Sequence, residues 1–239
     1  MNVLCIGNSF SQDSTRYLHQ ISNEEFYVRN LYIGGCSLET HWNNIVGERE
    51  DYEWQKNGRM LKMMSINNAL TKKKWDVITV QQVSHFSGMP ETYEPFLTNI
   101  LEFVKEKCPN AKIVFHRTWA YDDNSTHGGF VNYDNDRKKM INAIIETTNF
   151  FANKHGLEII PNGEAVEAAR DLPEFQGERN INRDGFHLSL DYGRYLAGLT
   201  MYGFLSGKDV TEVAYEPEDT DHEINMKLKE IAKSLTFNK

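Results

Sequence analysis

A chain of 239 residues with 40% hydrophobic and 12% aromatic residues is long enough to bury a full core, which argues against a disordered protein. Its formal net charge of -8 argues against nucleic acid as the main partner, and the only basic run is 72–74. Cys5, Cys36 and Cys108 lack metal-ligand spacing and cannot all form disulfides with one another, which favours a reducing compartment.

The start of the chain has no charged segment followed by an apolar one, and no apolar run is long enough to span a membrane. We therefore expect a cytoplasmic protein that has no membrane partner, or a secreted one if a signal peptide has been trimmed. The sequence does not indicate the oligomeric state.

The first predicted strand begins at about Asn2 and ends at Gly7, where the chain can turn sharply, and a helix is predicted over Gln12–Ser22. Ser9 lies at this junction. A hydroxyl beside the free N–H groups of a helix start is placed where a developing negative charge is stabilised. Serine is also a common helix cap, and from this stretch alone the two roles are equally well supported.

Apolar runs predict four more strands, each ending in a polar or glycine-containing loop: Phe26–Ile33, Asp76–Gln82, Lys112–His116 and Leu157–Ile160. Helical periodicity and end signals predict the helices Gly58–Lys73, Thr92–Lys107, Asp134–His155, Leu190–Ser206 and Asp221–Leu235. Alternating strands and helices predict an α/β fold, a three-layer α/β/α sandwich with a mainly parallel, flavodoxin-like sheet of five strands.

No linker or internal repeat is visible. We therefore expect a single domain over residues 1–239, with loop insertions at Glu39–Asn57 and Ala120–Tyr133. In such a sheet the ligand site lies beyond the carboxyl ends of the strands.

Near the end of the chain, Asp184 and His187 are spaced so that both fit within one turn. The carboxylate can then accept a hydrogen bond from imidazole Nδ1 and leave Nε2 free to act as a base. Taken alone, an Asp-x-x-His sequence is more often a surface turn with a capping aspartate. Its combination with a serine after the first strand favours a catalytic pair.

Gly7-Asn8-Ser9-Phe10-Ser11 resembles the first sequence block of the SGNH, or GDSL-type, hydrolase superfamily, with Asn8 where the motif has aspartate. Asp184-Gly185-Phe186-His187 is similar to the last block of that superfamily, Asp-x-x-His. The segment 30–37 resembles the second block, and the resemblance implies that Gly35 contributes its backbone N–H to an oxyanion hole.

The third block, normally Gly-x-Asn-Asp, is absent, and Gln81 and Gln82 stand in its place. By analogy with the asparagine of the superfamily, Gln82 is expected to donate a side-chain N–H to the oxyanion, with Gln81 and His85 as alternatives. If the strand alternates, the two glutamines point to opposite faces.

The resemblance implies a serine esterase with Ser9, His187 and Asp184 as the triad and Ser9, Gly35 and Gln82 around the oxyanion. Expected substrate contacts are Gln81, His85, His116 and Trp119. No metal-binding motif occurs, so we expect neither a metal ion nor a cofactor. The expected substrate is a small-molecule or carbohydrate ester, and an acetyl ester is favoured because no apolar lid segment for long lipid chains is visible.

Two alternatives use the same scaffold without hydrolysis. One is a nucleotide-binding module, but the sequence has no Gly-x-Gly-x-x-Gly or P-loop motif, and this role leaves Asp184 and His187 unused. The other is a non-catalytic member of the superfamily that binds glycan.

Overall fold

The computed structural model describes residues 1–177 and 179–237, which build around one seven-stranded sheet of order β4-β3-β2-β1-β5-β6-β7. The strands are β1 Asn2–Gly7, β2 Tyr27–Tyr32, β3 Tyr52–Lys56, β4 Arg59–Met64, β5 Val77–Val80, β6 Lys112–His116 and β7 Glu158–Ile160. Strands β2, β1, β5, β6 and β7 are parallel, whereas β3 pairs antiparallel with both β2 and β4. The predicted α/β class is confirmed, and the five predicted strands are the five parallel ones.

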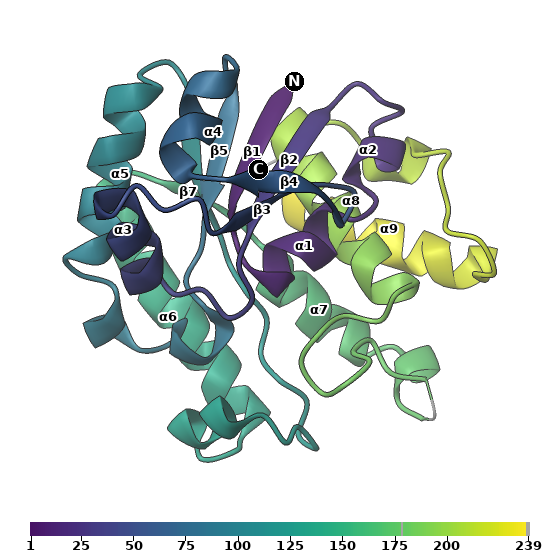
Figure 1. Cartoon of the computed structure of the whole chain (residues 1–239). Coiled ribbons are helices and arrows are strands. Elements are labelled where there is room, and N and C mark those ends of the chain that lie inside the picture. Colours follow the sequence, from purple (N-terminus) through teal and green to yellow (C-terminus); the bar gives the residue numbers. More distant parts are fainter. Residues whose placement is uncertain (178, 238–239) are drawn as a thin grey trace.

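Helices cover both faces of the sheet (Figure 1). They are α1 Ser9–Thr15, α2 Leu18–Ile21, α3 Leu38–Val46, α4 Ile66–Lys72, α5 Phe96–Lys107, α6 Arg137–His155, α7 Asn162–Arg170, α8 Tyr192–Ser206 and α9 His222–Thr236. Helix α8 contacts α1, α2, α7 and α9 on one side, and α5 contacts α3 and α4 on the other. Short 3-10 turns lie at Ser84–Phe86, Pro90–Thr92, Gly128–Tyr133, Pro173–Phe175 and Val210–Glu212.

The core has two halves because the sheet separates them. Along β1, Val3 and Cys5 point into the cluster that contains α8, while Leu4 and Ile6 point into the cluster that contains α5. This is the two-residue alternation expected of a strand that is buried on both faces.

The expected sheet of five strands is too small because an antiparallel hairpin, β3–β4, extends it. The hairpin occupies part of the segment Glu39–Asn57, which was predicted as a loop, and the first half of Gly58–Lys73, which was predicted as a helix. Its turn is Asn57-Gly58, with φ angles of 52° and 74°. An Asn-Gly pair with both residues at positive φ is typical of a two-residue hairpin.

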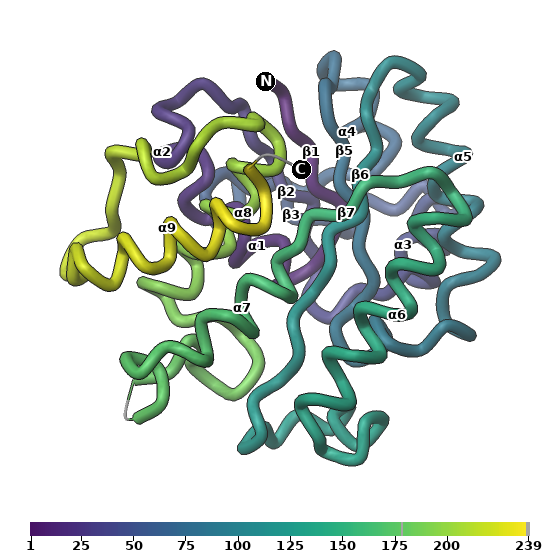
Figure 2. The backbone as a smooth tube through the Cα atoms, turned by 180° about the vertical axis from the view of Figure 1, so that it is seen from behind, coloured from purple at the N-terminus to yellow at the C-terminus, as the bar shows by residue number. Residues whose placement is uncertain are grey.

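The carboxyl ends of the parallel strands lie together at the lower edge of the sheet in Figure 1, and Figure 2 shows the loops after β6 and before α8 below that edge from behind. Strand β1 lies between β2 and β5, so the strands that follow it in the chain are added first on one side of β1 and then on the other. A crevice at such a switch point is the usual ligand site of an open α/β sheet. Ser9 follows β1 at this point.

Candidate active site

The helix that follows β1 is capped by Asn8. The Asn8 side chain accepts a hydrogen bond from the Phe10 N–H at 3.0 Å, and its backbone is extended. Ser9 is therefore the first residue of α1 and does not cap it, and neither Ser11 nor Asp13 takes that role. Ser9 is half-buried, and its hydroxyl forms no hydrogen bond with another residue that the structure describes. Its position leaves the hydroxyl free for chemistry at a helix N-terminus.

Asp184 and His187 form the hydrogen bond expected from their spacing, with 2.8 Å between Asp184 Oδ2 and His187 Nδ1. The other carboxylate oxygen accepts the backbone N–H groups of His187 and Phe186. Partial burial alone would raise the pKa of Asp184, but these hydrogen bonds outweigh it and the pKa is lowered. Ionised Asp184 keeps the imidazole proton on Nδ1, so Nε2 of neutral His187 is an acceptor.

Aromatic contacts bring the Ser9 helix to the His187 turn. Phe10 stacks on Trp119 with ring centroids 4.1 Å apart, and its ring lies 6.2 Å from the ring of His187. Trp119 Nε1 donates to the Phe186 carbonyl at 2.8 Å. Since Phe10 directly follows Ser9, these contacts hold the serine and the histidine in neighbouring segments at one edge of the sheet.

Gly35 follows β2 and lies at the same edge. It is exposed and has a φ of +63°, a conformation that favours glycine, and no atom lies within 4 Å of the position a Cβ would take. The glycine is therefore required for its backbone conformation and not for close packing.

Gln82 is not available as an oxyanion donor, contrary to the expectation from the sequence. Its side chain is completely buried, and Nε2 donates to both the carbonyl and the hydroxyl of Thr92, at 3.0 and 3.1 Å. Its Oε1 accepts the N–H groups of Leu38 and Val83. Gln82 thus ties β5 to the start of α3, with no amide hydrogen left over.

Gln81 points to the opposite side of the strand, as the alternation predicted, and joins a buried chain of side-chain hydrogen bonds. Asn8 Nδ2 donates to the Cys36 carbonyl, and Gln81 Nε2 donates to Asn8 Oδ1 at 2.9 Å. Gln81 Oε1 then lies 2.9 Å from His116 Nδ1, and Asn162 Nδ2 lies 2.8 Å from His116 Nε2. We call Asn8, Gln81, His116 and Asn162 the buried polar chain.

The backbone partners of Asn8 fix the orientation of this chain. Because Asn8 Oδ1 faces the N–H of Phe10, Gln81 must present its amide nitrogen to it and its oxygen to His116. His116 therefore carries its proton on Nδ1 and accepts on Nε2. Burial lowers the pKa of His116 to about 4, so the ring stays neutral.

His116 and Trp119 were expected to contact substrate, and the structure contradicts this because both side chains are completely buried. His116 is part of the buried polar chain, and Trp119 fills the space between Phe10 and the His187 turn. Gln81, only 1% exposed, is likewise a supporting residue and not a substrate contact.

His85 and His127 lie on the His187 side of the site. The His127 ring packs 4.9 Å from Phe186 and 5.4 Å from His85, and Phe186 packs 4.1 Å from His187. His127 Nδ1 accepts the Gly129 N–H, so the neutral ring donates through Nε2. Burial lowers the pKa of His127, and protonation of nearby His187 would lower it further. No sequence motif marks His127 as a site residue.

The site is open to solvent, since the Asp184 side chain is 42% exposed and Gly34 and Gly35 are exposed.

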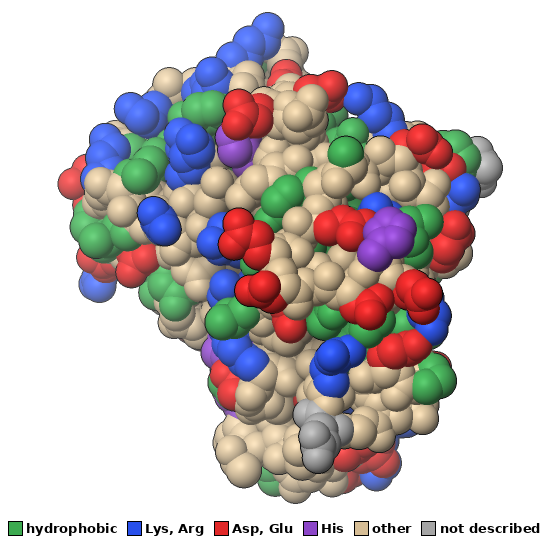
Figure 3. Space-filling view, turned by 90° about the vertical axis from the view of Figure 1, so that its right-hand side faces the viewer, with side chains coloured by type: hydrophobic (Ala, Val, Ile, Leu, Met, Phe, Trp, Pro, Cys, Tyr) green, Lys and Arg blue, Asp and Glu red, His purple; other side chains and the backbone are tan. Residues whose placement is uncertain are grey.

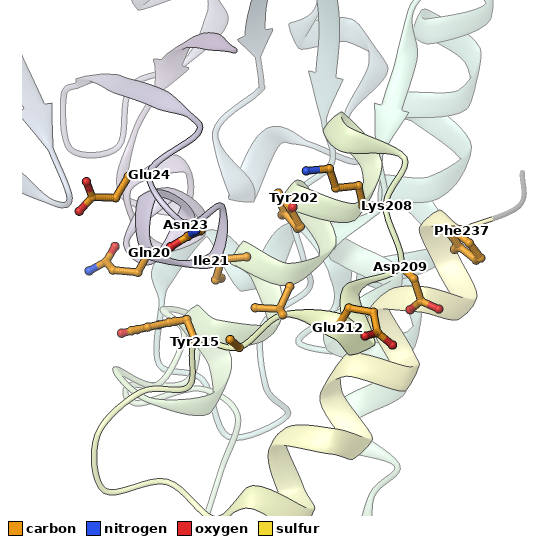
Figure 4. A pocket seen from close by; sticks show the side chains of 12 residues that line it. Gln20, Ile21, Asn23, Glu24, Tyr202, Lys208, Asp209, Glu212, Tyr215 and Phe237 are labelled. Atoms are coloured by element: carbon orange, nitrogen blue, oxygen red, sulfur yellow. The ribbon is translucent and has the colours of Figure 1, made fainter.

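A cavity of about 930 Å³ lies away from this site, between the ends of α2, α8 and α9, and is lined by Tyr202, Tyr215 and Phe237 among others (Figure 4). On the face that carries α2, α8 and α9, acidic side chains are spread among basic ones (Figure 3).

Within the part of the chain that the structure describes, no group of three His, Cys, Asp or Glu side chains is arranged to hold a metal ion. Over the same residues, no helix is both long and apolar enough to cross a bilayer.

A family model described as a domain of unknown function, DUF4886, matches residues 2–238. This chain belongs to the DUF4886 family. A crystal structure of a DUF4886 family protein from Bacteroides uniformis is 37% identical in sequence, with a TM-score of 0.90, and the match covers 98% of this chain and 93% of that one. No curated protein sequence matches.

More distant solved structures share the fold. A putative SGNH hydrolase from Slackia heliotrinireducens is 22% identical with a TM-score of 0.61, over 86% of this chain and 98% of that one. An acetyl xylan esterase, AlAXEase, is 14% identical with a TM-score of 0.56, over 85% of this chain and 98% of that one. The fold of this DUF4886 protein is therefore that of SGNH and GDSL-type hydrolases.

Proposed function

We propose that this DUF4886 protein is a serine hydrolase that cleaves carboxylic esters. The observation that carries the proposal is the 2.8 Å hydrogen bond between Asp184 and His187, at the sheet edge where Ser9 begins a helix with its hydroxyl unpaired. A nucleophile, a base and a group that orients the base are the three parts of a serine triad.

In the proposed reaction, Ser9 Oγ attacks the ester carbonyl while His187 Nε2 takes the hydroxyl proton. Asp184 stabilises the resulting imidazolium. The C–O bond to the alcohol then breaks, and the proton on Nε2 passes to the departing oxygen. Water, activated by His187, attacks the acyl-enzyme, and collapse of the second tetrahedral intermediate releases the acid and returns the proton to Ser9.

The developing oxyanion would be held by backbone N–H groups of Ser9 and Gly35. The Ser9 N–H belongs to the first turn of α1, where backbone N–H groups have no partner within the helix. Since Gln82 is bound to Thr92, these two donors and the helix N-terminus would carry the stabilisation. Removing a single oxyanion donor typically costs about 10²–10³ in rate.

The proposed substrates are short-chain acyl esters, chiefly acetyl esters, of a carbohydrate or a similar polar alcohol. The open site, with exposed Gly34 and Gly35, supports a bulky polar alcohol, because long acyl chains need an enclosed apolar channel. Half-buried His85 and His127 add polar groups beside Phe186, a combination suited to a sugar ring.

Replacing Ser9 by alanine tests the proposal. We expect Ser9→Ala to lose at least about 10³-fold of the activity toward an aryl acetate and all labelling by a fluorophosphonate, because no other group replaces the nucleophile. Ser234→Ala, at an exposed serine of α9, is the matched control and should behave like the unchanged protein.

The same assay, run on aryl esters of increasing chain length and then on acetylated sugars, tests the substrate class. Acetate should be preferred, and a preference for long chains would contradict the carbohydrate proposal. Equal labelling of Ser9→Ala and the unchanged protein would refute Ser9 as the nucleophile, and no labelling of the unchanged protein would favour a binding module.

A further inference from the structure

The Asp13 carboxylate is a completely buried charge in α1 whose partners come from the far end of the chain. Its oxygens accept hydrogen bonds from Arg194 Nε at 2.7 Å, the Leu188 N–H at 2.9 Å and Arg183 Nη1 at 3.2 Å. A buried carboxylate is tolerated only when it is paired and hydrogen-bonded in this way.

Two of these partners flank the Asp184–His187 pair. Arg183 immediately precedes Asp184, and Leu188 immediately follows His187. The turn between them is closed by the hydrogen bond from the Arg183 N–H to the His187 carbonyl at 2.9 Å. Arg183 Nη1 also donates to the Leu188 carbonyl. Asp13 therefore holds both ends of the turn that carries the histidine.

The same helix carries Ser9, four residues before Asp13. Residues four apart lie on one face of a helix, separated by about 6 Å along its axis. Helix α1 thus carries Ser9 at its start and, one helical turn later, the Asp13 carboxylate that binds the segment around His187.

We propose that Asp13 is a positioning residue that fixes His187 relative to Ser9. The proposal rests on the proposed serine hydrolase function. The charges at this junction balance, because Asp13 and Asp184 face Arg183 and Arg194, with Arg183 Nε 4.0 Å from Asp184 Oδ2. Removing the Asp13 charge leaves two guanidinium groups facing one carboxylate and frees the ends of the turn.

The test is Asp13→Asn, which keeps the size of the side chain and one acceptor oxygen. We expect kcat for an aryl acetate and the rate of fluorophosphonate labelling each to fall roughly 10²-fold, because a misplacement of about 1 Å costs that much. KM should change by less than about threefold, since Asp13 does not touch the substrate. If Asp13 had a purely structural role, the substitution would lower the stability, but the molecules that remain folded would keep their kcat and their labelling rate.

Glu216→Gln is the matched control, because Glu216 binds buried Lys229 in α9 at 2.8 Å. It should lower the melting temperature and leave kcat unchanged. If Asp13→Asn does not fold, Arg183→Gln and Arg194→Gln replace it. Both remove a partner of Asp13, but only Arg183 belongs to the His187 turn, so only Arg183→Gln should lower the labelling rate strongly.

The outcomes separate the two proposals. If the unchanged protein is labelled and folded Asp13→Asn is labelled at a rate within twofold of it, the positioning role is refuted and the esterase function stands. If the unchanged protein is neither labelled nor active, the proposed function fails first.

Discussion

Among single residues, His127 is the one that we propose contacts the substrate although no sequence motif marks it. Its ring packs against Phe186, next to His187, and the Gly129 N–H fixes its proton on Nε2. A fixed donor beside the proposed general base is suited to the alcohol part of an ester.

We expect His127→Phe, which keeps the ring packing and removes the donor, to raise KM for an acetylated sugar roughly fivefold to tenfold, the equivalent of one hydrogen bond of about 1 kcal/mol. The value of kcat should change little. Steady-state kinetics provide the measurement, and His222→Phe, at an exposed histidine of α9, is the control. An unchanged KM would exclude His127 from the substrate site.

For single residues, the sequence motifs predicted contacts between residues that are close in sequence and missed contacts between residues that are far apart in sequence. The Asp184–His187 hydrogen bond follows from a spacing of three residues, whereas the partners of Asp13 lie more than 160 residues away. The assignment of Gln82 as an oxyanion donor was wrong. The alternation of side chains along a strand predicts that Gln81 and Gln82 point to opposite faces, but it does not predict which of the two binds Thr92. The burial of His116 and Trp119 could not be predicted, because the residues next to them in the sequence do not indicate which distant segments pack over the end of the strand.

Among the secondary-structure elements, the five parallel strands and the helices α5, α6, α8 and α9 were predicted in their order and nearly at their bounds, whereas α3 lies in a predicted loop and α7 was not predicted. The hairpin β3–β4 was missed because the apolar residues of 60–64 also fit a helical period. The Asn57-Gly58 pair was the signal that distinguishes the two, since it favours a hairpin turn and disfavours a helix interior.

Gly58→Ala tests the importance of that turn. With φ at 74°, an alanine Cβ is strained, and we expect a loss of roughly 1 kcal/mol in the free energy of unfolding, or about 2–4 °C in melting temperature. Gly128→Ala is the control, because Gly128 lacks a positive φ and has no atom within 4 Å of the Cβ position. Equal melting temperatures for the two variants would contradict the strained turn.

For the whole molecule, two buried histidines couple folding to pH. Burial lowers the pKa of His116 to about 4 and that of His41 to about 3, while in the unfolded chain both titrate near 6.5. The unfolded state therefore binds more protons between these values. The corresponding stability is present above about pH 6.5 and is lost as the pH falls toward 4, at up to about 1.4 kcal/mol per pH unit for each group.

Thermal unfolding between pH 7 and pH 5 measures this loss, and the melting temperature should fall steadily across the interval. His41→Phe, which keeps a ring against Tyr52, should reduce the slope, because it removes one of the histidines whose pKa is lowered, while His116, His85 and His127 keep their contributions. The carboxylates of Glu94 and Asp209, with pKa values lowered to about 2, lose their contribution only at lower pH. A slope that His41→Phe leaves unchanged would assign the acid sensitivity to other groups.

The buried polar chain also constrains how this sequence can change over evolution. Every bond in it has the same direction, from Asn162 through His116 and Gln81 to Asn8 and the Cys36 carbonyl. A carboxylate in place of Gln81 or Asn8 would place two hydrogen-bond acceptors opposite each other in the buried interior. Positions 8, 81, 116 and 162, spread over most of the chain, should therefore vary among relatives as one linked set, and a change at one position should be accompanied by changes at the others.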